Sequence, residues 1–102
     1  MYSKKMVSPA VMRNLRTLGL DLRDARLRRN LTMEVIADRA GTTRQTINRI
    51  EKGDPGVSIG TYAGMMSALG LASNLASIAS LANDERGVAL AASEARQRAR
   101  PR

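Results

Sequence analysis

The chain has 102 residues, a net charge of +8 and only two aromatic side chains, and it contains neither cysteine nor histidine. This length accommodates one domain. Without Cys and His, disulfides, the common zinc sites and catalytic centres built on either residue are excluded, so we expect no metal, no cofactor and no enzymatic activity. The scarcity of aromatic residues disfavours a β-sandwich or barrel and single-strand binding by base stacking. The positive charge favours a polyanionic partner, either nucleic acid or an acidic membrane surface.

No apolar run approaches the roughly 20 residues that a membrane-spanning helix requires. The N-terminal segment MYSKKMVSPA lacks the apolar core of a secretory signal. We therefore expect a cytoplasmic protein with no membrane partner.

The first predicted helix follows a flexible arm that we expect over residues 1–8. Ser8 and Pro9 form a helix-start signal, with Ser as the N-cap and Pro at the first helical position. Apolar residues then recur at helical spacing, and the helix should end at the segment RRN, where positive charge complements the helix dipole. Gly19 weakens the helix interior by about 1 kcal/mol, so the helix begins either at Pro9 or nearer Leu15.

Two short helices are predicted next. Thr32 is the N-cap of a helix over 33–40, and Thr43 is the N-cap of a helix over 44–52. Gly41 fits the turn between them because glycine adopts positive φ without penalty.

Two further helices and a tail complete the prediction. Ser58 caps a fourth helix that ends near residue 70, and a fifth helix runs from 72 or 73 to 81. The expected apolar face of the fourth helix consists of Ile59, Tyr62, Ala63, Met66 and Leu69. The basic tail, 84–102, is expected to be mobile, although its Ala-rich part could form a helix when bound.

The second and third helices contain the most informative pattern. Ala37 is small where another helix must approach, Gly41 allows the turn, and Ile47 and Ile50 point back to pack against the preceding helix. This arrangement is typical of a helix-turn-helix. Glu51 is expected to pair with an arginine, either Arg26 or Arg39. The core of this motif spans 33–52.

The run LTMEVIADRAGTTRQTINRIEKG resembles the helix-turn-helix of the Cro/C1-type, or Xre-type, repressors. The resemblance covers Leu15 to Leu81. It implies an all-α, five-helix lambda-repressor-like domain over 1–83, dimeric binding to palindromic operators, and a third helix in the major groove of double-stranded DNA. The sequence departs from the family at Met33, where glutamine is common and contacts a DNA phosphate. Affinity would then depend more on basic residues elsewhere.

The third helix should present a polar face opposite its two isoleucines. Arg44 could chelate a guanine, and Gln45 or Asn48 could pair with an adenine, with Thr43 at the leading end of the helix. The residues expected to contact phosphates are Thr42, Thr46, Arg49, Arg23 and Lys52. The alternative is an ordinary solvated face without a binding role.

The later helices are expected to form a dimer interface. Met65 and Met66 are adjacent and are not expected to face one core together. Leu71, Leu75 and Ile78 lie beyond the helix-turn-helix, and an exposed apolar stripe usually marks an interface. We predict a homodimer through these residues, with a larger monomeric core as the alternative.

A narrower resemblance concerns the segments DPGVSIGT, ALGL and LAND and the basic tail, which are similar to HipB-like antitoxins. This resemblance implies a transcriptional repressor of its own operon and a HipA-like kinase toxin as a partner. The tail would contact the toxin or the DNA backbone, or be unstructured. Two alternatives stay open, namely an antitoxin whose main task is neutralising the toxin, and a stand-alone Xre-type regulator.

Overall fold

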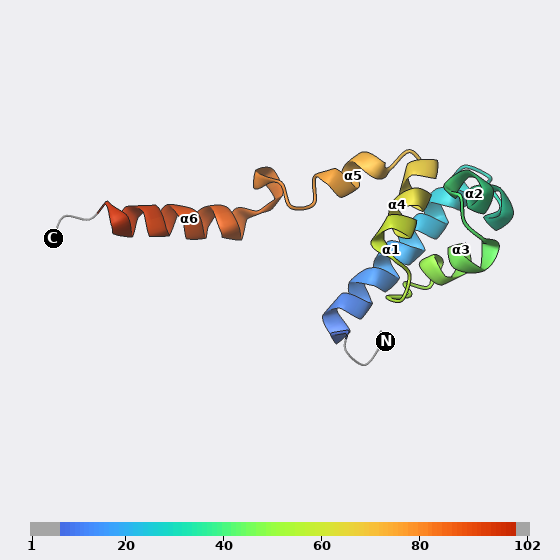
Figure 1. The fold of residues 1–102 in the computed structure, drawn as a ribbon, viewed down its shortest axis with the longest axis horizontal. Coiled ribbons are helices and arrows are strands. Elements are labelled where there is room, and N and C mark those ends of the chain that lie inside the picture. The colour runs from blue at the N-terminus through green and yellow to red at the C-terminus, as the bar shows by residue number, and fades with distance from the viewer. Residues whose placement is uncertain (1–6, 100–102) are drawn as a thin grey trace. The chain divides into compact units, whose positions relative to one another are not determined.

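The structure is a computed structural model that describes residues 7–99, and within this range all regular structure is helical (Figure 1). The predicted all-α class is confirmed. The elements are α1 Pro9–Arg28, α2 Met33–Ala40, α3 Arg44–Glu51, α4 Ile59–Ala68, α5 Ala72–Ala76, the 3₁₀ turn Leu81–Asn83 and α6 Glu85–Arg98. The chain divides into two compact units, residues 1–72 and 73–102. Most of the expected arm, residues 1–6, lies outside the described residues.

The first four helices begin at hydroxyl N-caps, as predicted. In each, the cap oxygen accepts a hydrogen bond from a backbone amide three residues on, which satisfies one of the free donors at the helix start. The bonds are Val11 N to Ser8 Oγ (3.2 Å), Val35 N to Thr32 Oγ1 (3.1 Å), Thr46 N to Thr43 Oγ1 (3.2 Å) and Thr61 N to Ser58 Oγ (3.1 Å).

Helix α1 begins at Pro9, so the later start near Leu15 is wrong. Gly19 lies in the helix interior for a packing reason. A Cβ at this position would lie 2.5 Å from the carbonyl oxygen of Ile50, a distance that Cβ atoms in proteins essentially never show. The missing side chain therefore lets α1 approach the C-terminal end of α3, and this packing outweighs the weak helix propensity of glycine.

The core of the first unit lies between α1, α2, α3 and α4. Its buried apolar residues are Leu22, Ala25, Ile36, Ala37, Ile47, Ile50, Val57, Tyr62, Met65, Met66 and Leu69. Helix α2 packs against both α3 and α4, and α1 packs against α3. These contacts place the short helix α3 against two neighbours while one of its sides stays open to solvent.

Two predictions about α4 are wrong. Met65 and Met66 are both buried, because Tyr62, Met65, Met66 and Leu69 follow the i, i+3, i+4, i+7 spacing of one apolar helix face, which is wide enough to hold two adjacent positions. Ile59 is 74% exposed and does not belong to the core, because it is the first residue of the helix and lies at its end. The adjacent methionines therefore add little to the exposed apolar surface.

Helix α5 ends at Ala76 rather than at residue 81, so this boundary is also wrong. The hydroxyl of Ser77 donates to the carbonyl of Asn74 (3.0 Å), and the amide of Asn83 donates to the carbonyl of Ser77 (2.7 Å). Such side-chain bonds offer the backbone an alternative to the helical ladder just beyond the last residue of α5. The tail contains α6, whose N-cap Asp84 accepts from the amide of Gly87 (3.0 Å).

Candidate nucleic-acid interface

Helices α2 and α3 are joined by a tight turn at Gly41, as predicted. Gly41 has φ +69°, the left-handed conformation that favours glycine. The amide of Thr42 donates to the carbonyl of Ala37 (2.9 Å), which closes the end of α2. Ile47 and Ile50 are fully buried. The inward orientation of these two isoleucines is confirmed, and it fixes which side of α3 faces outward.

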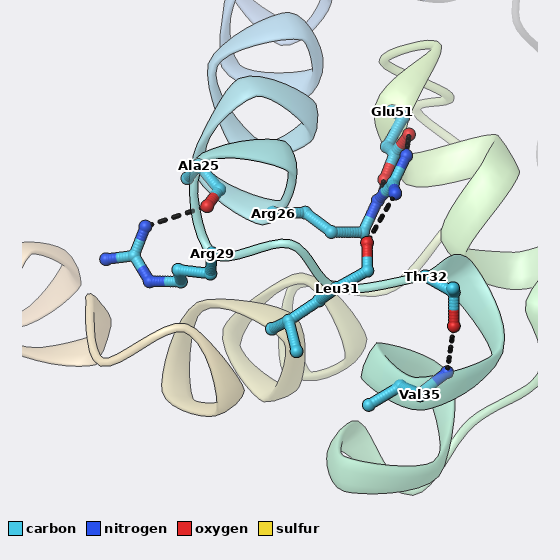
Figure 2. Close-up of polar contacts among 7 residues, drawn as sticks. All are labelled: Ala25, Arg26, Arg29, Leu31, Thr32, Val35 and Glu51. Atoms are coloured by element: carbon cyan, nitrogen blue, oxygen red, sulfur yellow. Dashed lines mark hydrogen bonds and ion pairs between the residues drawn. The ribbon is translucent and has the colours of Figure 1, made fainter.

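A buried ion pair holds the end of α3 to α1 (Figure 2). The guanidinium of Arg26 donates from Nε to Glu51 Oε2 (2.7 Å) and from Nη2 to Oε1 (3.0 Å), and its Nη1 donates to the carbonyl of Leu31 (2.8 Å). The hydrogen bond to Glu51 raises the pKa of Arg26 even though burial acts in the opposite direction. Of the two arginines expected to pair with Glu51, Arg26 is the one that does. Bidentate pairs of this kind are strong and directional, so the pair sets the position of α3.

The outward side of α3 begins with exposed polar residues. Arg44 and Gln45 are exposed and Asn48 is half-buried, so all three reach the surface on the side away from the isoleucines. Arg44 Nε forms an ion pair with Glu34 Oε1 at 2.9 Å, and the two side chains are 60% and 65% exposed. Arg44 is therefore held at the surface by a residue of α2, a contact that the sequence analysis did not predict.

The threonines at the start of α3 bond to one another. The hydroxyls of Thr43 and Thr46 lie 3.0 Å apart, and Thr43 also caps the helix. Thr43 is exposed, and Thr42 and Thr46 are half-buried. The hydroxyl of Thr43 thus has a local structural task, and only its remaining hydrogen-bonding capacity is open to a ligand.

Arg49 braces the loop that follows α3. Its Nε donates to Asp54 Oδ2 (2.8 Å), and Asp54 Oδ1 accepts from the amide of Gly56 (2.8 Å). The hydroxyl of Tyr62 donates to the backbone carbonyl of Asp54 (2.7 Å). Burial, with a smaller contribution from the Asp54 carboxylate, raises the pKa of Tyr62 to about 12. Arg49 therefore has a structural role beside the phosphate contact predicted for it.

The family comparison agrees with this geometry. A family model described as a helix-turn-helix domain matches residues 17–77, more than half of the chain. The chain belongs to this helix-turn-helix family. It is accordingly an Xre-like, DNA-binding transcriptional regulator. Comparison with curated protein sequences gave no match.

The described residues of this helix-turn-helix protein contain neither a candidate membrane-spanning helix nor a candidate metal-binding cluster. Among residues 7–99, no helix is both long and apolar enough to cross a membrane. In the same residues, no cluster of acidic side chains is arranged to hold a metal ion.

The remaining predicted phosphate contacts of the helix-turn-helix protein lie at the surface. Arg23 is exposed on α1, and Lys52 is exposed at the end of α3. Met33, at the start of α2, is half-buried. The sequence analysis missed Glu34 and Asp54 as partners of Arg44 and Arg49. An acidic residue in the first turn of α2 was visible in the sequence, but its neighbour on another helix was not.

Proposed function

We propose that this helix-turn-helix protein is a repressor that binds a palindromic operator as a homodimer, with α3 in the major groove. The supporting observation is the division of α3 into two sides. Ile47 and Ile50 are fully buried, while Arg44 and Gln45 are exposed in the first turn. The N-terminal part of a recognition helix is the part that reaches base edges.

The two kinds of DNA contact would come from different residues. Arg44 would chelate guanine, and Gln45 or Asn48 would pair with adenine, because these side chains match the donor and acceptor patterns of those bases. Thr43 would add to this reading at the leading end of the helix. The phosphates would be contacted by Thr42, Thr46, Arg49, Arg23 and Lys52, which would orient the protein without selecting a sequence.

A homodimer would match the two half-sites of a palindrome. Within the described residues, Leu71 and Leu75 are half-buried and Ile78 is 65% exposed, so a second copy would remove apolar surface from water. Sedimentation at micromolar concentration tests this proposal. Only monomer in the parent, or the same association in the parent and in Ile78→Asp, would contradict it.

The operator proposal is tested by selecting bound duplexes from a random pool. The selected sequences should form an inverted repeat. Arg44→Ala should lose about 10- to 100-fold of its preference at one base pair of each half-site. Lys52→Ala should instead weaken binding to all duplexes and lower the salt dependence by about one ion. A parent that prefers no duplex, or an Arg44→Ala variant with unchanged preference, would contradict the proposal.

A second candidate function is that of a HipB-like antitoxin, and the state of the second unit favours it. No side chain in residues 73–99 is buried, and Ile78 and Leu81 are mostly exposed. A partner of the HipA-like kinase class would cover this apolar surface, and the protein would act by binding rather than by catalysis. Co-expression with a kinase encoded beside it should give a stoichiometric complex. A stand-alone regulator would form no such complex and would still repress its operator.

A further inference from the structure

The first turns of α2 and α3 are connected by one ion pair, that of Glu34 with Arg44. The carboxylate oxygen Oε1 lies 2.9 Å from Nε of the guanidinium. Glu34 is the acidic residue in the first turn of α2, and Arg44 is the first residue of α3. Both side chains are more than half exposed, so the pair lies at the surface that meets DNA under the proposed function.

The chemistry of the guanidinium allows Arg44 two partners at once. It has five N–H donors in a planar fork. A carboxylate at Nε occupies part of this fork and leaves further donors for a second acceptor. Guanine offers two acceptors, O6 and N7, on its major-groove edge. An arginine bound to Glu34 on one side could therefore still read a guanine on the other.

A free arginine side chain samples many conformations, and ordering it on binding opposes affinity. A neighbour that restricts the arginine side chain before binding reduces this entropic penalty. The reduction helps only where the duplex places a guanine in reach of the restricted guanidinium. Glu34 also places a negative charge near the phosphates, which weakens binding to every sequence. Restricting Arg44 favours binding to guanine, and the negative charge weakens the background binding to phosphates. Both effects therefore increase the discrimination between DNA sequences.

We propose that Glu34 is a positioning residue that determines specificity, because it holds Arg44 in the orientation that reads guanine. This inference rests on the proposed function. The alternative is an ordinary surface ion pair, which contributes little to stability and nothing to base preference. Stability measurements do not separate these possibilities, so the test measures base preference.

The experiment is a double-mutant cycle on Glu34 and Arg44 in the full chain. The parent, Glu34→Ala, Arg44→Ala and the double variant are titrated at one salt concentration. The probes are the selected operator, the operator changed at the guanine of each half-site, and a random duplex. Glu94→Ala is the matched control, because Glu94 forms another exposed ion pair, with Arg98 in α6 (2.7 Å), and its loss changes net charge equally.

Glu34→Ala should reduce discrimination at the guanine by about 3- to 10-fold and raise affinity for the random duplex by about 2- to 5-fold. In the Arg44→Ala background, removing Glu34 should not change discrimination further. Glu34→Gln retains an acceptor oxygen but not the charge. It should recover part of the discrimination while its affinity for the random duplex stays raised. Glu94→Ala should leave discrimination unchanged.

Full discrimination in Glu34→Ala would overturn the inference, and so would an equal loss in the Arg44→Ala background or in Glu94→Ala. These results would leave the operator proposal intact. A parent that prefers no duplex over another would overturn the operator proposal itself, and with it this inference. Melting curves for each variant distinguish a change in reading from a loss of folded protein.

Discussion

Replacing Glu51 by Gln should destabilise the protein strongly, although the two side chains have nearly the same shape. The side chains of Glu51 and Arg26 are only 4% and 8% exposed. The substitution leaves a buried guanidinium without its counter-charge, while the bond to the carbonyl of Leu31 remains. Removing one partner of a buried pair costs about 3–5 kcal/mol. Because Gln keeps one acceptor, we expect a loss of about 2–4 kcal/mol.

This loss is large, because the free energy of unfolding of native proteins is typically about 5–15 kcal/mol. Each kcal/mol corresponds to about 4–8 °C in Tm for a small domain, so Tm should fall by about 8–32 °C. Thermal and urea unfolding followed by far-UV circular dichroism measure both quantities. Glu34→Gln is the matched control, because it makes the same chemical change at an exposed ion pair and should cost less than about 1 kcal/mol.

A double variant separates the loss of the pair from the isolation of its charge. Arg26→Met with Glu51→Leu removes both charges from the core and should recover most of the stability that Glu51→Gln loses. The reasoning is refuted if Glu51→Gln is no less stable than Glu34→Gln. It is also refuted if the double variant is as unstable as Glu51→Gln.

Three further predictions concern backbone packing and pH. Gly19→Ala should destabilise the protein by about 1–3 kcal/mol in urea unfolding, despite the better helix propensity of alanine. The reason is that the alanine Cβ would lie 2.5 Å from the carbonyl oxygen of Ile50. A variant more stable than the parent would disprove this close approach. Gly41 and Gly53 have φ of +69° and +72°, but only at Gly53 would a Cβ also lie 2.6 Å from the backbone of α1. Gly41→Ala should cost about 1 kcal/mol and Gly53→Ala at least about 1 kcal/mol more, and equal losses would argue against the contact. The pKa of Tyr62 is about 12 in the folded protein against about 10 when unfolded, so its contribution is complete below pH 10 and is lost as the pH rises toward 12. Between these values the parent should lose about 1–2 kcal/mol more than Tyr62→Phe, and parallel pH profiles would contradict this.

The features predicted correctly from the sequence are those encoded within a few neighbouring residues. Hydroxyl caps such as Ser8 and Thr32 and the turn at Gly41 each depend on local backbone geometry. The inward side of α3 followed from the spacing of Ile47 and Ile50, because a helix places residues three apart on the same face. These signals were sufficient for the fold class and for the side of α3 that carries the candidate site.

The errors have both local and distant causes. The sequence analysis assigned Met65 and Met66 to different faces, although with Tyr62 and Leu69 they follow the i, i+3, i+4, i+7 spacing of one apolar stripe. The early end of α5 is followed by local bonds from Ser77 and Asn83 to the backbone, which the apolar spacing did not indicate. The partner of Arg44 lies on another helix, and nothing in the spacing of charges distinguishes it from the other acidic residues.

The separation of α3 into an inward and an outward side has a consequence for how such a regulator can diversify. The outward residues Arg44 and Gln45 are exposed, and substitutions at such positions usually change stability by less than about 0.5 kcal/mol. Ile47, Ile50 and Glu51 have no such freedom. Under the proposed function, operator choice could therefore drift, or be re-engineered, on an unchanged scaffold.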